Sequence, residues 1–212
     1  MNESNDTHGA QQPLKFVDKQ QHINISGIRL PHWSQTCCTQ FVTFRLADSL
    51  PQTKLREYQQ KRAEWLNNHP KPWDEETIKE YGSTFDETME RWIDAGYGEC
   101  LLQYPEVRKV VADALLHNDG TEYDLHAMVI MPNHVHILLS PHQGFSLQTM
   151  MGSCKQFAAR KVNKLLDRRG ALWERECFDH MIRNQQDYAK KLEYIVDNPR
   201  HLPIGTYTLL VK

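Results

Sequence analysis

The sequence predicts an α+β protein with a ferredoxin-like βαββαβ antiparallel sheet and helices on one face of that sheet. Two kinds of pattern alternate along the chain. Short runs rich in β-branched and aromatic residues favour strands, and longer runs with apolar residues at helical spacing favour amphipathic helices. The expected elements are strand 41–46, helix 106–118, strands 123–131 and 134–140, helix 147–166 and strand 177–182.

Local signals indicate where these elements end. Asn118, Asp119 and Gly120 end the first helix of this unit, and glycine is the residue type that most often ends a helix. Pro132 and Asn133 form a turn signal between two strands, which are therefore expected to pair as a hairpin. A further C-terminal helix is expected at 185–197, because Pro199 disfavours helical geometry in the residue before it.

The length of 212 residues fits one domain that carries an insertion. Residues 1–25 are polar and are expected to form a flexible N-terminal segment. Residues 26–200 should form the domain, with an acidic helical insertion at about 50–98 that contains helices around 54–68 and 86–95, and residues 201–212 should form a short tail. The sequence has no run of eighteen apolar residues and no apolar signal core, so we expect a cytoplasmic protein. Five cysteines without a C-x-x-C pair argue against a zinc ribbon or a disulfide framework.

Charge is distributed unevenly along the chain, although the net charge is only −2. Residues 48–124 carry 9 Lys+Arg against 17 Asp+Glu, a net of −8, whereas residues 151–191 carry 10 against 5, a net of +5. A polyanion would be attracted to the second region and repelled by the first. An ordinary solvated helix face would explain the basic region equally well.

The second strand of the expected hairpin contains two histidines separated by one residue. Side chains of a strand alternate between its faces, so His134 and His136 should lie side by side on one face. Val135, Ile137 and Leu139 should then face the helices. Two neutral imidazoles at this spacing can bind one divalent cation. Two surface histidines, or two hydrogen-bonded ones, are the alternative interpretation.

The last helix presents three polar side chains on one face. Tyr194 and Asn198 are four residues apart, and Lys191 precedes Tyr194 by three. A phenol is a weak nucleophile at neutral pH, and a nearby metal or cation can activate it by stabilising the phenoxide. The amide oxygen of Asn198 would complete a metal site, and Lys191 would hold a phosphate. A tyrosine packed on a helix surface for structural reasons is the alternative.

The two elements occur together in one chain, and the sequence resembles the REP-associated tyrosine transposases, a branch of the single-tyrosine HUH transposases. The resemblance rests on the hallmarks MPNHVH at 131–136 and YIVDNP at 194–199. Supporting matches at 29–33, 41–48 and 173–180 extend it over about residues 28–200.

The resemblance implies a specific chemistry for the site. It implies that His134 and His136 bind a metal ion, that Asn198 is the third ligand, and that Tyr194 is the catalytic nucleophile. Attack on single-stranded DNA would leave a 5′-phosphotyrosine link and a free 3′-hydroxyl. The implied partners are REP-type palindromes folded as single-stranded hairpins, and the implied cofactor is Mg²⁺ or Mn²⁺. Imidazole suits softer metals, so hard phosphate oxygens and water would have to complete the coordination of Mg²⁺.

Several further residues are candidate contacts to DNA. Basic side chains would bind phosphates, and a basic-aromatic arm would stack on the bases that flank the hairpin, unless that arm only clamps the sheet. His180 is either an accessory site residue or a core histidine. The DNA-binding candidates are Lys155, Arg160, Lys161, Lys164, Arg183, Lys191, Arg29, His32, Trp33 and Arg45.

Two other functions fit parts of the pattern. The first is a hairpin-DNA-binding protein, domesticated from a transposase, that does not cut DNA. The second is a zinc hydrolase in which Asp124 or His126 of the neighbouring strand adds a ligand and Tyr194 is structural. The preferred function remains a cytoplasmic, nucleoid-associated strand-transfer enzyme that acts as a monomer or homodimer without a membrane partner.

Overall fold

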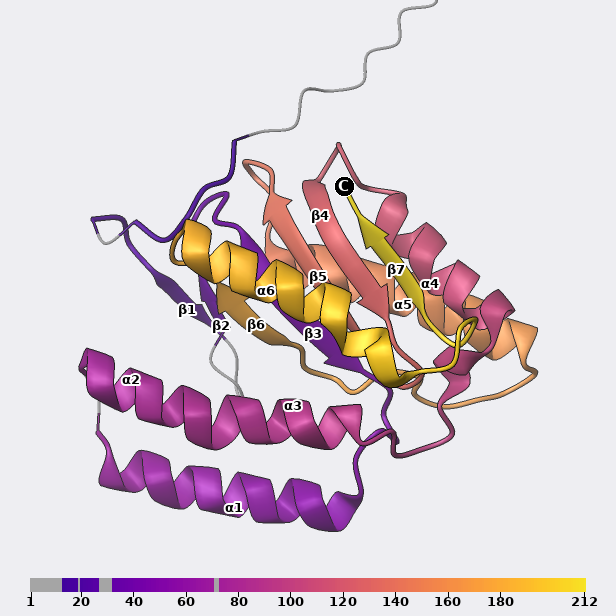
Figure 1. The fold of residues 1–212 in the computed structure, drawn as a ribbon, viewed down its shortest axis with the longest axis horizontal. Coiled ribbons are helices and arrows are strands. Elements are labelled where there is room, and N and C mark those ends of the chain that lie inside the picture. Colours follow the sequence, from indigo (N-terminus) through magenta and orange to yellow (C-terminus); the bar gives the residue numbers. More distant parts are fainter. Residues whose placement is uncertain (1–12, 19, 27–31, 71–72) are drawn as a thin grey trace, which may run out of the picture.

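The computed structural model describes residues 13–18, 20–26, 32–70 and 73–212 (Figure 1). Within this part of the chain, five antiparallel strands form the main sheet in the order β6-β3-β5-β4-β7. The first four strands have the order of a ferredoxin-like βαββαβ unit, so the predicted fold class is confirmed. The strands are β3 (Gln40–Arg45), β4 (Tyr123–Ile130), β5 (His134–Pro141), β6 (Phe178–Met181) and β7 (Thr208–Val211).

Helices cover the sheet on both faces. On one face, α4 (Pro105–Leu116) and α5 (Leu147–Leu165) pack on the larger apolar core, which includes Val135, Ile137 and Leu139 as predicted. On the other face, α6 (Gln185–Asp197) packs on a smaller core (Figure 1). Because strand side chains alternate between faces, this second face also receives His134 and His136.

The insertion is a helical arm with an apolar core of its own. It contains α1 (Gln52–Asn68), α2 (Glu75–Tyr81), a π-helical turn (Gly82–Asp86) and α3 (Glu87–Asp94). The two outer helices match the prediction, whereas α2 and the turn were not predicted. This core is formed by Leu50, Tyr58, Phe85, Met89 and Ile93.

Strand β7 lies in residues 201–212, for which the sequence predicted only a tail. A 3₁₀ turn at Asn198–His201 leads from α6 towards it. The buried Arg108 of α4 holds the returning chain, because its guanidinium donates to the carbonyl of Gly205 and to Oγ1 of Thr208. The signal for β7 is weak, since its four residues lie at the sheet edge and alternate between half-buried and exposed.

The N-terminal segment contacts the sheet where the structure describes it. Thr39 N–H donates to the carbonyl of Lys15 at 2.7 Å, and Val17 N–H donates to the carbonyl of Ile182 at 3.0 Å. Two short strands, β1 (Asn24–Ser26) and β2 (His32–Ser34), pair separately from the main sheet. All five cysteines are free thiols. Every helix in the described part of the chain is too short or too polar to cross a bilayer.

Candidate metal and nucleophile site

The two histidines of β5 lie side by side and are almost fully buried. His134 is 1% and His136 is 0% exposed, and their ring centroids are 4.6 Å apart. In each ring Nδ1 has a partner: Asn133 Oδ1 at 2.8 Å for His134, and Thr43 Oγ1 at 2.7 Å for His136. In each ring Nε2 is buried and has no hydrogen bond. A buried nitrogen without a hydrogen bond is costly, and a bound cation would satisfy both of these atoms.

Asn133 fixes the proton of His134 on Nδ1. Its amide nitrogen donates to the carbonyls of Ile93 and Tyr97 at 3.1 and 3.2 Å, which sets the orientation of the amide. The amide oxygen therefore faces His134 Nδ1, and an oxygen of this kind can only accept. Nδ1 of His134 must carry the proton, so the lone pair of Nε2 is free for a metal. The sequence indicated Asn133 only as a turn residue.

We expect Asn133→Ala to weaken Mn²⁺ binding by about 10–100-fold, because orienting partners of metal-bound histidines typically contribute this much. Isothermal titration calorimetry with Mn²⁺ measures the change. The control is Asn163→Ala, which removes an amide that donates to the carbonyl of Gly170 in the loop after α5. Mn²⁺ affinity equal to that of the wild type would show that Asn133 does not orient the site.

A carboxylate from the insertion lies against the histidine pair. Asp94, the last residue of α3, places Oδ1 3.4 Å from Nε2 of His134. One ligand atom from each of Asp94, His134 and His136 can be chosen so that all three lie within 4.8 Å of one another. Sequence reasoning missed Asp94, since the only available signal was the acidic charge of the whole insertion.

The nucleophile predicted from sequence lies beside this cluster. The ring of Tyr194 meets that of His136 edge-on, with centroids 5.1 Å apart, and its hydroxyl donates to Asp94 Oδ2 at 3.5 Å. The side chain of Asn198 is hydrogen-bonded to both Asp94 and Tyr194. Tyr194 of α6 and Asn198, the first residue of the 3₁₀ turn that follows it, therefore both meet Asp94 beside the histidines.

Burial controls protonation throughout the cluster. It lowers the pKa of His134 to about 3, and burial together with the charges of His134 and Lys191 lowers the pKa of His136 well below its usual value. Burial also raises the pKa of Asp94 to about 6. The pKa of Tyr194 is raised by burial and then by the carboxylates of Glu90 and Asp94. Both imidazoles are thus neutral at pH 7, and Tyr194 holds its proton as long as no metal ion is bound beside it.

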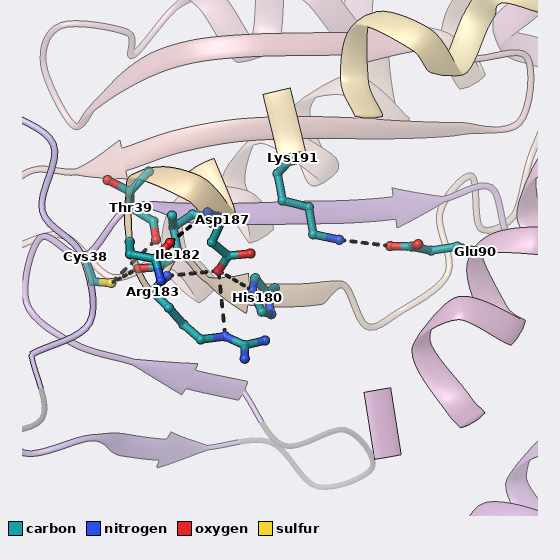
Figure 2. A network of polar contacts seen from close by, with 9 residues as sticks. Cys38, Thr39, Glu90, His180, Ile182, Arg183, Asp187 and Lys191 are labelled. Carbon is teal, nitrogen blue, oxygen red and sulfur yellow. Dashed lines mark hydrogen bonds and ion pairs between the residues drawn. The ribbon is translucent and has the colours of Figure 1, made fainter. Parts of the chain in front are cut away.

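Lys191 lies over two rings of the site. Its Nζ is 4.5 Å from the ring centroid of Phe41 and 5.5 Å from that of Tyr194. The ammonium is paired with Glu90 Oε1 of α3 at 3.5 Å, the contact drawn on the right of Figure 2. A phosphate bound by Lys191 would therefore have to compete with this carboxylate.

The predicted basic surface is divided by the sheet. Arg160, Lys161 and Lys164 are exposed on α5, which packs on the face opposite to α6 and Tyr194 (Figure 1). Sequence reasoning grouped them with the site because helical periodicity does not tell which face of a sheet a helix covers. These three side chains cannot bind a phosphate that Tyr194 attacks.

Two other basic candidates are occupied by the protein itself. Lys155 Nζ donates to the carbonyls of Glu174 and Arg175 at 2.8 and 3.0 Å. Arg45 is buried and paired with Glu174 at 3.2 Å, and it also donates to Ser49. Both side chains therefore support the chain around Glu174.

His180 supports the start of α6. Its Nε2 lies 3.0 Å from Oδ2 of Asp187, which also accepts the backbone N–H of Arg183 at 3.0 Å (Figure 2). Asn184 caps the helix by accepting from the Asp187 N–H. The structure thus gives His180 a positioning contact to the N-terminus of α6, and leaves the Arg183 guanidinium largely exposed.

Asp187→Asn should lower the stability at neutral pH by about 1 kcal/mol, or about 2–4 °C in Tm. Burial alone raises the pKa of Asp187, but hydrogen bonds from His180 and Arg183 outweigh it and lower the pKa to about 2. A depressed pKa stabilises the fold above the unfolded-state value and loses this effect as pH falls from about 4 to about 2. Thermal melts of both proteins should converge over this range, whereas a constant difference would contradict the assignment.

The arm predicted to guide the flanking bases is described only in part. Arg29 lies outside the described residues, and the structure describes the backbone but not the side chain of His32. Trp33 is half-buried in β2 and pairs with Ile25. The role of this arm therefore remains a prediction.

The residues that a zinc hydrolase would require are engaged elsewhere. His126 Nε2 is hydrogen-bonded to Ser140 Oγ at 2.8 Å, and Asp124 pairs with His142 at 3.1 Å. Neither belongs to the cluster around His134 and His136. The carboxylate that lies beside the histidines is that of Asp94 in α3.

Comparison with known proteins finds a family model, a curated relative and a solved structure that are similar to this chain. Residues 104–198 match the family model described as "Transposase IS200 like", a segment that contains both histidines, Tyr194 and Asn198. A Haemophilus influenzae protein named for the REP-associated tyrosine transposases is 29% identical, over 34% of this chain and 47% of the relative. A solved structure of a REP-associated tyrosine transposase bound to a REP hairpin has a TM-score of 0.46 and 15% identity, over 82% of this chain and 73% of that one.

Residues 104–198 are thus similar to the IS200-like transposases, and the resemblance to the REP-associated tyrosine transposases that the two hallmarks predicted is confirmed. The chain spans about half the length of the curated relative that it matches. The insertion lies outside the matched segment.

Proposed function

We propose that the chain is a metal-dependent tyrosine transesterase that cuts and rejoins single-stranded DNA at the foot of REP-like hairpins. One observation carries the proposal. The phenol of Tyr194 lies against the buried pair of His134 and His136, whose two Nε2 atoms have no hydrogen bond. If Tyr194 had only a packing role, nothing would account for the two buried imidazole nitrogens beside it that have no hydrogen bond.

The side chains of the site have distinct roles in this reaction. The oxygen of Tyr194 attacks the scissile phosphorus, forming a phosphotyrosine bond while the bond from phosphorus to the 3′ oxygen breaks. The phenol loses its proton to the buffer, and the departing 3′ oxygen takes one up. Lys191 and Arg183, both on the α6 side of the sheet, are the candidates that remain for holding phosphates. Rejoining reverses these steps with a 3′-hydroxyl as the attacking group, so no ATP is needed.

The donor set suits a divalent cation such as Mg²⁺ or Mn²⁺. His134 and His136 would hold it, with an oxygen ligand from Asn198 or another side chain. When bound, the cation would stabilise negative charge on the scissile phosphate and on the phenolic oxygen. The protein supplies a buried, preformed imidazole pair for this purpose and keeps both rings neutral.

The test uses a single-stranded hairpin from the DNA that flanks the gene. The oligonucleotide is labelled at its 3′ end in one reaction and at its 5′ end in another, with and without Mn²⁺. We expect the 3′ label to migrate with the protein on a denaturing gel and the 5′ label to appear in a shorter product with a free 3′-hydroxyl. Hairpin binding without a covalent adduct would instead support the non-catalytic function, and protein-free cleavage products would support a hydrolase.

A further inference from the structure

Two hydrogen-bond acceptors face each other in the site. The proton of His134 is fixed on Nδ1 by Asn133, so Nε2 presents a lone pair, and Asp94 Oδ1 lies 3.4 Å from it. Nε2 of His134 and Nε2 of His136 are buried and have no hydrogen bond. Two acceptors at this separation repel each other, and a cation between them turns the repulsion into attraction.

The spacing of these atoms suits one hard cation. Ligands of Mg²⁺ lie at about 2.0–2.1 Å, so adjacent ligand atoms of an octahedron are about 3 Å apart and opposite ones about 4 Å apart. Asp94 Oδ1 is 3.4 Å from Nε2 of His134, and the three ligand atoms of the cluster lie within 4.8 Å of one another. Small shifts would bring all three atoms within bonding distance of one ion.

The chain holds the end of α3 at this place by several contacts. Asn133, the neighbour of His134, bonds the carbonyls of Ile93 and Tyr97 on either side of Asp94. Ile93 itself is only 1% exposed in the core of the insertion. Asp94 therefore sits on a segment bonded directly to the histidine strand.

The base of the insertion is held equally closely. Asp48 Oδ2 accepts the N–H of Glu99 at 2.7 Å, across the two ends of the insertion. Gly98 has φ +94°, and a Cβ at this position would lie 2.7 Å from the carbonyl oxygen of Asp48. Only glycine fits this approach without strain.

We infer that Asp94 is a metal ligand, so that the acidic insertion supplies the carboxylate of a two-histidine, one-carboxylate site. This inference rests on the proposed function and names a ligand outside the matched segment 104–198. A carboxylate adds a hard, negatively charged donor to two imidazoles, which favours Mn²⁺ and Mg²⁺ over what two imidazoles alone would prefer. Its second oxygen accepts from the Tyr194 hydroxyl at 3.5 Å, so the same side chain also positions the nucleophile.

The test measures Mn²⁺ affinity by titration calorimetry and by loss of the electron paramagnetic resonance signal of free Mn²⁺. Asp94→Asn keeps the shape of the side chain, which is about a third exposed, so the variant should fold. Circular dichroism checks that it does. We expect Mn²⁺ affinity to fall at least tenfold. The matched control is Glu90→Gln, one turn earlier on α3, which breaks the pair with Lys191 and should leave Mn²⁺ affinity within about twofold of the wild type.

Wild-type Mn²⁺ affinity in folded Asp94→Asn would overturn the inference, as would an equal loss in Glu90→Gln, which would indicate a general charge effect. Neither result would affect the proposed function, which depends on the adduct formed by the wild-type protein. Conversely, absence of that adduct with normal Mn²⁺ binding would reject the transesterase and leave the ligand assignment standing.

Discussion

The Tyr194→Phe protein should form no detectable covalent adduct with a labelled hairpin. We expect its rate of adduct formation to be at least about a thousandfold below that of the wild type. The substitution removes only the oxygen that makes the phosphotyrosine bond. The ring contacts remain, with Phe41 at 5.8 Å and His136 at 5.1 Å between centroids. The fold should tolerate the change, because the hydroxyl donates only a long 3.5 Å bond to Asp94 and shares a contact with Asn198.

Two measurements separate loss of chemistry from loss of binding. A gel shift should show hairpin affinity within about threefold of the wild type, since a phenol oxygen contributes at most about one hydrogen bond to binding. Tyr188→Phe is the matched control, because this second tyrosine of α6 packs against His126 rather than the site and should keep full adduct formation. An adduct on the Tyr194→Phe protein would show that another residue is the nucleophile.

The second large effect is expected for His136→Ala. Removing one of two buried imidazoles should weaken Mn²⁺ binding at least a hundredfold and abolish metal-dependent cleavage, because one imidazole and the oxygen ligands hold the ion less tightly than the complete set. The wild-type protein in excess chelator should show the same loss. Undiminished cleavage in chelator would remove the metal from the mechanism.

The control must account for the hole left in the protein by this change. His136 is fully buried and stacks on Phe41 with centroids 5.3 Å apart, so its loss also destabilises the fold. His126→Ala removes another buried histidine of the same sheet, whose Nε2 is satisfied by Ser140. We expect this variant to lose comparable stability but to keep Mn²⁺ affinity. Equal loss of affinity in both variants would point to unfolding rather than to a lost ligand.

Two neighbouring acidic residues of the insertion are expected to differ in their effect on Mn²⁺ affinity. Glu90 and Asp94 lie one turn apart on α3, yet Glu90 faces Lys191 and Asp94 faces His134 and Tyr194. Net charge treats the two carboxylates as equal, whereas their contacts make one a partner of a cation on α6 and the other a candidate ligand. Two acidic residues of the insertion therefore make specific contacts at the site.

The sequence by itself determined the elements whose patterns are local. Period-two alternation placed His134 and His136 on one face of β5, and helical spacing placed Tyr194 of α6 on the same side as Asn198 directly after that helix. The order of strands and helices was enough to predict the βαββαβ sheet, because few topologies satisfy that order. These features depend on residues close together in the chain.

Only the tertiary structure decided which distant segments meet. It brought Asp94 to His134, made residues 208–211 a fifth strand, and placed Arg160 across the sheet from Tyr194. The physical reason is that periodicity tells which side of a helix or strand is apolar but not which partner covers it. That choice depends on how whole elements bury apolar surface against one another and satisfy buried polar groups, as Asn133 does for the end of α3.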